Sequence, residues 1–317
     1  MPEGHSVHRI ARAFSQNFLG KTVEVSSPQG RFVEGARLID GRRLVASRAV
    51  GKQMFLEFDN QLWLRVHLGL YGAWDFAGDF GPAVARPAAQ RGTFLDRDDA
   101  EDSTASIGAP RRTRLRMSEG EAPSELDAPF PPPPIGAVRV RLLTGDMVAD
   151  LRGPTACQVQ SPQEVAVSIS KLGPDPLVDD RAAGAERFVS VVRKKATSIG
   201  LLLMDQSVVS GIGNVYRAEL LFRAGLNPRT PGKLVPEKVV RALWDDWCYL
   251  LEIGVATGQM LTMDGLTPAA QKRALNYRSD RHWVYHRAGL PCRSCGTTIA
   301  LEVMGGRKLY HCPTEQA

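Results

Sequence analysis

The spacing of apolar residues changes along the chain, and each change indicates a different kind of structure. Short segments rich in β-branched and aromatic residues, separated by Gly-containing turns, predict strands at 22–25, 44–46, 54–58, 62–66, 138–143 and 147–151. The third and fourth of these are predicted to form a hairpin across residues 59–61. Before the first of the predicted strands, apolar residues recur at three- and four-residue intervals, which predicts an N-terminal helix. The apolar stripe of this helix consists of Val7, Ile10, Ala11, Phe14 and Phe18.

From residue 162 onward the apolar positions take a helical spacing. Helices are predicted at 163–169, 182–192, 199–206, 215–224 and 236–257. We therefore predict an α+β multidomain protein. Its parts are an N-terminal helix with a β-sandwich over residues 1–165, a helical domain over 166–270 and a small cysteine-bearing region over 271–317.

Residues 79–134 differ in composition from the rest of the chain. They hold nine of the 21 prolines, with ten acidic and seven basic side chains. This composition predicts a mostly disordered insertion that ends in a polyproline segment at 131–134. A basic cluster within it could contact nucleic acid, although a solvated charged loop is the favoured interpretation. The cluster comprises Arg111, Arg112, Arg114 and Arg116.

Charge and cysteine usage narrow the class of protein. The net charge of +6 indicates a polyanionic partner, and the chain from residue 271 carries eight Lys/Arg against three Asp/Glu. The sequence contains no apolar run of membrane-spanning length and no signal-peptide core, so we expect a cytoplasmic protein. Three of the five cysteines fall in the last 26 residues, which in a reducing compartment favours a metal over a disulfide.

Pro2 and Glu3 stand directly before the first helix. Removal of Met1 would leave a secondary amine on Pro2, at a helix N-terminus whose partial positive charge disfavours protonation. An unprotonated amine beside a carboxylate is what imine chemistry on a sugar aldehyde requires. The alternative is structural, because proline is common at the start of helices.

A second candidate site lies where a helix runs into Ser210-Gly211-Ile212-Gly213 and another helix begins at Asn214. Asparagine is a preferred N-cap residue, and two glycines allow the backbone to approach a partner closely. The amides at this helix start, together with the Asn214 side chain, predict a phosphate site. An ordinary helix–turn–helix corner is the alternative.

The C-terminal cysteines have the spacing of a zinc ribbon with one ligand missing. Cys292 and Cys295 form a Cys-x-x-Cys pair, and Cys312 follows after sixteen residues, with Glu315 at the position of the usual fourth cysteine. Glu315 or His311 would complete four zinc ligands, and a degenerate site is the third possibility. Between the cysteines, residues 305–308 predict a tight turn that presents two cations.

Four segments together resemble the bacterial formamidopyrimidine-DNA glycosylase and endonuclease VIII family: 2–5, 51–52, 206–216 and 284–292. The resemblance implies a β-sandwich, a helix–two-turn–helix domain and a zinc finger. It also implies a bifunctional DNA glycosylase and AP lyase of base-excision repair. In that activity the Pro2 nitrogen attacks the sugar carbon bearing a damaged base, Glu3 protonates the ring oxygen, and β,δ-elimination cleaves the strand.

The resemblance also assigns roles to residues that contact DNA. Lys52 is expected near the phosphates, where it supports proton transfer, and Asn214 and Arg307 are expected to bind phosphates. Leu70 and Tyr71 occupy the region that fills the gap left by the extruded base, with strand core as the alternative. The remaining expectations are DNA contacts by Lys194 and Lys195 and a structural zinc held by Cys292, Cys295, Cys312 and Glu315.

The start Pro-Glu-Gly-His and the Leu-Tyr-Gly segment are similar to the endonuclease VIII branch, which favours oxidised pyrimidines. We therefore expect a monomeric bacterial enzyme that acts on damaged DNA in the nucleoid. The main alternative is a noncatalytic DNA-binding or damage-sensing protein on the same fold.

Overall fold

The computed structural model describes residues 2–78, 106–108 and 130–317, and the chain divides into two compact units. The first unit contains Pro2, residues 6–49 and the described part of 53–166. The second contains Val167–Ala317 and two short pieces from early in the chain, Glu3–His5 and Val50–Lys52. The chain therefore enters the second unit twice before residue 167.

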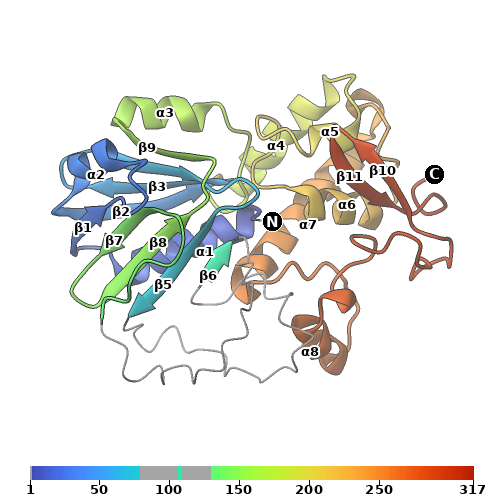
Figure 1. The fold of residues 1–317 in the computed structure, drawn as a ribbon. Helices are drawn as coiled ribbons and strands as arrows, with labels where there is room; N and C mark the ends of the chain where they lie inside the picture. The colour runs from blue at the N-terminus through green and yellow to red at the C-terminus, as the bar shows by residue number, and fades with distance from the viewer. Residues whose placement is uncertain (1, 79–105, 109–129) are drawn as a thin grey trace, which may run out of the picture. The chain divides into compact units, whose positions relative to one another are not determined.

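The first unit is built on one sheet of nine strands (Figure 1). Their order across the sheet is β6-β5-β8-β7-β1-β2-β3-β4-β9. The strands are β1 (Thr22–Ser26), β2 (Arg42–Val50), β3 (Gln53–Phe58), β4 (Trp63–His67), β5 (Ala73–Gly78), β6 (Ser106–Gly108), β7 (Val138–Leu143), β8 (Met147–Arg152) and β9 (Ala156–Gln160). The hairpin predicted across residues 59–61 is confirmed, because β3 and β4 pair in antiparallel register.

Helix α1 (Gly4–Asn17) contributes to the core of this unit. Its predicted apolar stripe is buried, and Phe14 packs edge-to-face on Trp74 of β5, with ring centroids 4.9 Å apart. Leu56 of β3 belongs to the same core as Trp74, although β3 and β5 stand far apart in the strand order. The sheet therefore folds over a shared core, as the predicted sandwich requires.

Part of the predicted insertion is ordered. Residues 106–108 form β6, which pairs with β5, and Ile107 is buried in the core. The sequence analysis did not predict this strand, because a short strand stabilised by pairing carries no periodic signal of its own. The other residues of 79–129, including the cluster Arg111–Arg116, lie outside the described residues. The spacing of apolar residues also left α2 (Val33–Ile39), β5 and β9 unpredicted.

The second unit is mainly helical. Helix α3 (Pro162–Ser170) leads into it from the first unit. The elements of the second unit that follow α3 are α4 (Arg181–Arg193), α5 (Ile199–Leu202), α6 (Asn214–Arg223), η3 (Gly232–Leu234), α7 (Glu237–Thr257), α8 (Pro268–Asn276), η4 (Arg278–Asp280), β10 (Ala300–Met304) and β11 (Arg307–His311). Helix α5 ends earlier than predicted, because the Asp205 carboxylate accepts hydrogen bonds from the amide and hydroxyl of Ser207 and favours a turn. Helix α8 was not predicted.

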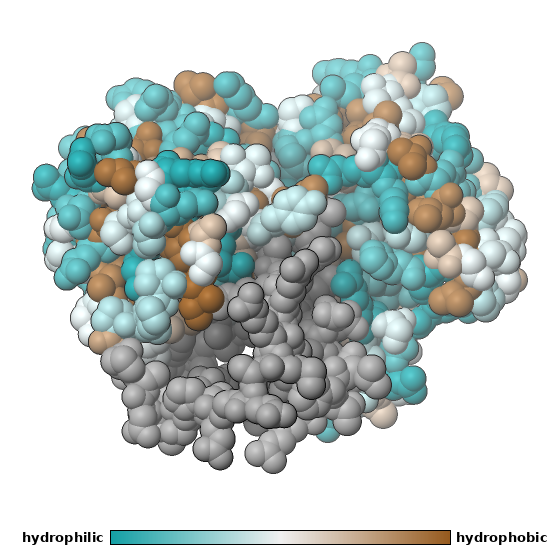
Figure 2. Space-filling view, in the orientation of Figure 1, coloured by the Kyte–Doolittle hydropathy of each residue, from teal (hydrophilic) through white to brown (hydrophobic). Residues whose placement is uncertain are grey.

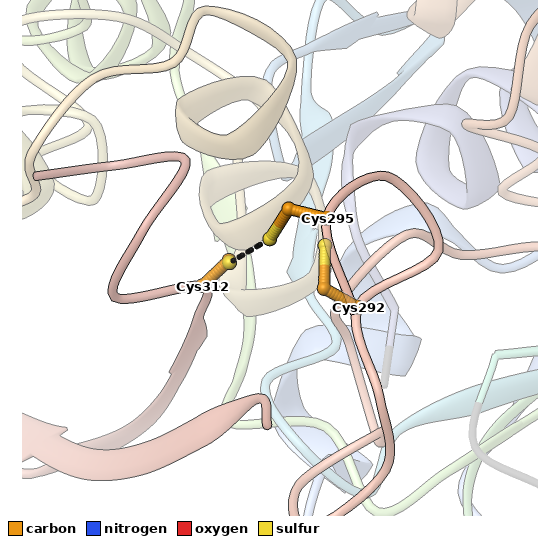
Figure 3. A group of neighbouring side chains, drawn as sticks. All are labelled: Cys292, Cys295 and Cys312. Carbon is orange, nitrogen blue, oxygen red and sulfur yellow. Dashed lines mark hydrogen bonds between the residues drawn. The ribbon is translucent and has the colours of Figure 1, made fainter. Parts of the chain in front are cut away.

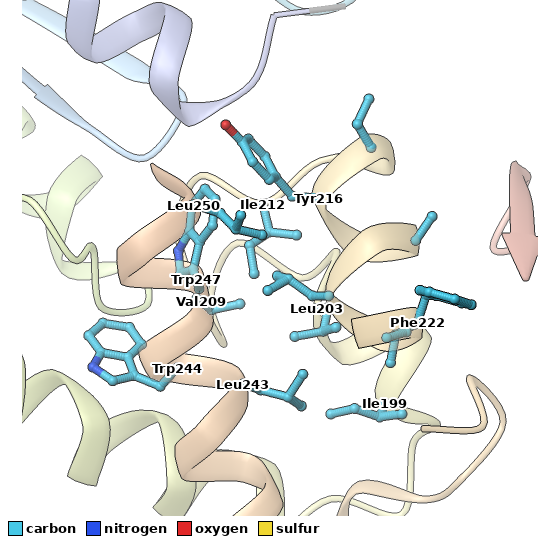
Figure 4. Packing of buried hydrophobic residues seen from close by; sticks show 14 of the residues in the cluster. Ile199, Leu203, Val209, Ile212, Tyr216, Phe222, Leu243, Trp244, Trp247 and Leu250 are labelled. Atoms are coloured by element: carbon cyan, nitrogen blue, oxygen red, sulfur yellow. The ribbon is translucent and has the colours of Figure 1, made fainter. Parts of the chain in front are cut away.

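The core of the second unit is formed by buried residues of α4, α6 and α7, among others, and Figure 4 shows part of it around α6 and α7. Trp244 and Trp247 of α7 and Tyr216 of α6 are almost completely buried. Gly184 of α4 makes room for one indole, since a Cβ there would lie 2.5 Å from the Trp244 ring. Outside the cores, Figure 2 shows hydrophobic residues as small separate spots on the viewed face. None of the helices in the described ranges combines the length and apolar character that a bilayer crossing needs.

The buried Glu219 of α6 fixes the segment that leads to the C-terminal cysteines. Its carboxylate accepts backbone N–H bonds from Trp283 (2.8 Å), Val284 (2.9 Å) and Tyr285 (2.8 Å), and a hydroxyl bond from Thr262. A buried carboxylate is stable in a protein only when such donors replace its hydration. These hydrogen bonds therefore stabilise the buried carboxylate of Glu219 and also satisfy three backbone N–H groups.

We expect Glu219→Ala to lower the free energy of unfolding by about 3 kcal/mol or more, because three buried N–H groups lose their acceptor. Urea unfolding followed by circular dichroism measures this change. The matched control is Glu186→Ala, which removes an exposed ion pair with Arg241 and should leave the midpoint near that of the wild type. Equal midpoints for the two variants would contradict the role of Glu219.

Candidate active site

Glu3 is completely buried at the start of helix α6. Its carboxylate accepts N–H bonds from Gly213 (2.8 Å), Val215 (2.9 Å) and Tyr216 (3.4 Å). The positive end of a helix stabilises an anion at this position. The helix start that the sequence indicates as a phosphate site thus holds a carboxylate of the chain itself, and the expectation that these amides bind phosphate is wrong in this structure.

Glycines allow the two chain segments to meet. The amide of Gly4 donates to the Gly211 carbonyl (2.9 Å), and a Cβ on Gly4 would lie 2.9 Å from the Gly211 Cα. A Cβ on Gly213 would lie 2.3 Å from the Glu3 carboxyl carbon. The close backbone approach that the glycine pair predicted is therefore real, and the partner is the N-terminal segment.

Lys52 is bound to the same loop as Glu3. Its ammonium group donates to the carbonyl of Ile212 (2.6 Å), which also accepts a bond from the Gln206 side chain (3.1 Å). Gly51 precedes it with a φ of 57° and donates its amide to Asp175 (2.5 Å). These bonds fix the lysine next to the segment that holds Glu3.

Burial shifts the protonation of both groups. It raises the pKa of Glu3, while the Lys52 charge and the amides of Val215 and Gly213 oppose the shift. It lowers the pKa of Lys52 to about 8; the Glu3 charge opposes this shift, and the Arg307 charge adds to it. A carboxyl with a raised pKa is a suitable proton donor, and an amine with a pKa near 8 can exchange protons close to neutrality.

The start of α6 also contacts the C-terminal hairpin formed by β10 and β11. The Asn214 side-chain nitrogen donates to the Lys308 carbonyl (2.8 Å), and its oxygen accepts from Arg217 (2.6 Å). The predicted tight turn at Gly305-Gly306 is confirmed, and Arg307 follows it with an exposed side chain. The second unit therefore brings Glu3, Lys52, Asn214 and Arg307 into one region, and it adds Arg217, which the sequence analysis missed.

The other predicted site residues lie elsewhere. Leu70 and Tyr71 are in the turn between β4 and β5 of the first unit, 41% and 77% exposed. Their alternative interpretation as strand core is wrong. Lys194 is exposed at the C-cap of α4, and Lys195, which follows it, is half-buried. Pro2 belongs to the first unit and precedes Glu3 in the chain.

The three C-terminal cysteines converge. Their sulfur atoms lie within 4.8 Å of one another, and the Cys295 and Cys312 sulfurs are 3.5 Å apart (Figure 3). Three thiols at this separation suit a thiophilic ion such as zinc. The Glu315 amide donates to the Cys312 sulfur (3.5 Å), whereas the Glu315 carboxylate accepts from Ser294 (2.8 Å). His311 instead pairs with Glu302 (3.0 Å).

We expect Lys52 to titrate with a pKa of about 8, measured by NMR of its side-chain ¹³Cε and ¹⁵Nζ nuclei. Glu3→Gln should lower this pKa by removing an attractive charge, and Arg307→Ala should raise it by removing a repulsive one. Arg241→Met, which removes a cation that takes no part in the Lys52 shift, is the control and should leave the titration unchanged. A wild-type midpoint above about 10, the ordinary value for lysine, would contradict the assigned environment.

The structural elements described above match known proteins over the whole chain. The family model described as the formamidopyrimidine-DNA glycosylase N-terminal domain matches residues 1–122, and the model described as the formamidopyrimidine-DNA glycosylase H2TH domain matches residues 172–264. The formamidopyrimidine-DNA glycosylase of Lactococcus lactis, bound to DNA that contains an AP site, superposes with a TM-score of 0.69 at 18% identity, covering 99% of each chain. The MutM protein of Thermus thermophilus gives 0.66 at 23% identity, covering 99% of this chain and 98% of its own.

Sequence relatives point the same way. Proteins named endonuclease 8 1 from Mycobacterium tuberculosis and Mycobacterium bovis are each 36% identical to this chain over 318 residues, covering both chains completely. The predicted fold class and family resemblance are thereby confirmed. The chain belongs to the formamidopyrimidine-DNA glycosylase and endonuclease VIII family, whose members are DNA glycosylases and AP lyases of base-excision repair.

Proposed function

We propose that this protein removes oxidised bases from DNA, with oxidised pyrimidines preferred, and cleaves the strand by β,δ-elimination. The observation that carries the proposal is Glu3, a fully buried carboxyl group with a raised pKa that follows Pro2 directly in the chain. The preference for pyrimidines is supported by the Pro-Glu-Gly-His start and by the similarity to proteins named endonuclease 8.

In the proposed reaction, removal of Met1 frees the Pro2 nitrogen. This nitrogen attacks C1′ of the damaged nucleotide, and the bond to the base breaks with the electron pair leaving on the base, which takes up the proton that the Pro2 nitrogen releases. Glu3 donates its proton to the ring oxygen as the sugar opens, which leaves an iminium ion on Pro2. The iminium accepts electrons when the C2′ proton departs, so the 3′ phosphate is eliminated first and the 5′ phosphate second. Lys52 supports these proton transfers from its place beside Glu3.

Six residues are proposed to contact DNA. Arg307, exposed at the hairpin turn, and Asn214, at the start of α6, bind phosphates near the flipped nucleotide. Leu70 and Tyr71 fill the gap in the base stack, a role supported by their exposure in a turn. Lys194 and Lys195 add contacts to the phosphate backbone.

A structural zinc ion is proposed at Cys292, Cys295 and Cys312. Glu315 is the favoured fourth ligand, because its amide already bonds to the Cys312 sulfur and His311 is paired with Glu302. Bound zinc would hold the two cysteine segments together and take no part in strand cleavage. We further propose that the enzyme is a monomer in the bacterial nucleoid, with the helical domain at 166–270 and the zinc-finger region at 271–317 as two functional parts of the second unit.

Borohydride trapping on DNA with an abasic site tests the catalytic proposal. The wild type should give a covalent adduct through its N-terminus, because borohydride reduces the iminium to a stable amine. Pro2→Gly should trap poorly, and Glu3→Gln should slow base removal by about 10²-fold or more. Arg241→Met, with its change outside the proposed site, should trap like the wild type.

If the wild type binds abasic DNA but forms no adduct, the protein is a noncatalytic damage-binding member of the family. If Glu3→Gln removes bases at the wild-type rate, Glu3 is not the proton donor.

Metal analysis tests the zinc proposal. We expect one zinc per wild-type chain and none in Cys312→Ser. Glu315→Ala should weaken zinc binding by more than the roughly 10–100-fold that loss of an outer-shell partner costs. His311→Ala should keep its zinc. Wild-type protein purified without zinc, and unable to take it up, would overturn the proposal.

A further inference from the structure

Arg217 is a buried cation that the proposed chemistry does not use. Its side chain is 0% exposed, and arginines buried this completely are normally paired with a carboxylate. No ion pair to a carboxylate is formed by Arg217 within the described ranges of the chain. Burial lowers its pKa to about 10, with the more distant Glu3 charge opposing the shift and the Arg307 charge adding to it. Because burying a cation without a carboxylate partner costs free energy, we expect Arg217 to have a specific role.

The guanidinium group joins three separate pieces of backbone and side chain. One nitrogen, Nη2, donates to the Asn214 side-chain oxygen (2.6 Å) and to the Lys308 carbonyl (3.0 Å). The other, Nη1, donates to the Met304 carbonyl (3.4 Å). Met304 and Lys308 stand on the two strands that flank the turn carrying Arg307. A single side chain thus contacts the first residue of α6 and both sides of that turn.

These bonds also determine which way the Asn214 side chain points. A guanidinium group only donates hydrogen bonds, so the oxygen of the Asn214 carboxamide must face Arg217. Its nitrogen donates to the Lys308 carbonyl (2.8 Å), which also accepts from Arg217 (3.0 Å). Rotation of the carboxamide by about 180° would set its nitrogen against the Arg217 donors and its oxygen against the Lys308 carbonyl oxygen. Arg217 and the carbonyl that it binds therefore select one orientation of the Asn214 side chain.

We propose that Arg217 is a positioning residue for DNA binding, which holds the Asn214 carboxamide and the Arg307 turn together as one preassembled phosphate-binding pair. This inference rests on the proposed function, in which Asn214 and Arg307 bind the DNA phosphate backbone. Arg217 itself is too buried to touch DNA. Its contribution is preorganisation, because two donors already held in place lose less conformational freedom on binding.

The test compares binding of duplex DNA that contains a stable abasic-site analogue, over a series of salt concentrations. Arg217→Met should weaken binding about tenfold and reduce the slope of log Kd against log salt by about one, as one phosphate contact is lost. Arg217→Lys keeps the charge but cannot reach three acceptors, so binding should stay at least about threefold weaker than wild type. Arg241→Met removes the same charge from a surface ion pair and should bind normally.

A multiple mutant shows whether Arg217 acts through Asn214 and Arg307. If it does, adding Arg217→Met to the double variant Asn214→Ala/Arg307→Ala should weaken binding by less than about twofold beyond the double variant alone. A full tenfold further loss would overturn the inference, as would wild-type affinity and salt slope in Arg217→Met. If Arg217→Met fails to fold, Arg217→Lys decides the question through its Kd and through the NMR signals of the Asn214 side-chain amide, which should shift.

The outcome can be separated from that of the proposed function. Failure of the wild type to form a borohydride adduct would overturn the glycosylase proposal while leaving the effect of Arg217 on binding intact. Wild-type affinity in both Asn214→Ala and Arg307→Ala would overturn the phosphate-binding pair and, with it, the role of Arg217.

Discussion

The burial of the Glu3 carboxylate is the constraint on which the second unit depends. Removing an ion of this size from water costs several kcal/mol, and the cost is offset only where fixed donors replace the lost hydration. The donors here are amides of the loop and helix start around residues 213–216, with the Lys52 charge nearby. The first residues of the chain are therefore held to a helix that begins at Asn214, far along the sequence.

The balance between burial and hydrogen bonding at Glu3 also sets the pKa of its carboxyl group. Amide donors alone would depress the pKa of a carboxyl group and leave it a poor acid. Complete burial works against them, and for Glu3 burial is the larger effect, so its pKa is raised. Lys52 is affected in the opposite sense, since burial and the Arg307 charge lower its pKa. Two groups that would be fully ionised in water are thus brought closer to the protonation states that proton transfer needs.

Sequence patterns predicted the features that residues close together in the chain determine. The stripe from Val7 to Phe18, the hairpin across residues 59–61 and the turn before Arg307 follow from spacing and turn residues alone. The same reasoning predicted a phosphate at the helix start at Asn214, where the amides instead bind the Glu3 carboxylate. It could not find this carboxylate, because the distance in sequence between Glu3 and Val215 leaves no local pattern. Arg217 was missed for a similar reason, since Met304 and Lys308, which accept its hydrogen bonds, lie far from it in the sequence.

Helix α6 is the frame from which the remaining contacts are arranged. Its first turn binds Glu3, and Asn214 and Arg217 in that turn and the next contact the C-terminal hairpin. Further along the helix, Glu219 binds the backbone of 283–285, just before the first cysteines. The C-terminal region is thus attached to α6 at two points that involve no metal. An isolated zinc ribbon depends on its metal for folding. The region with the three clustered cysteines, which has Glu315 where a zinc ribbon has its fourth cysteine, is instead also fixed to α6 by buried hydrogen bonds.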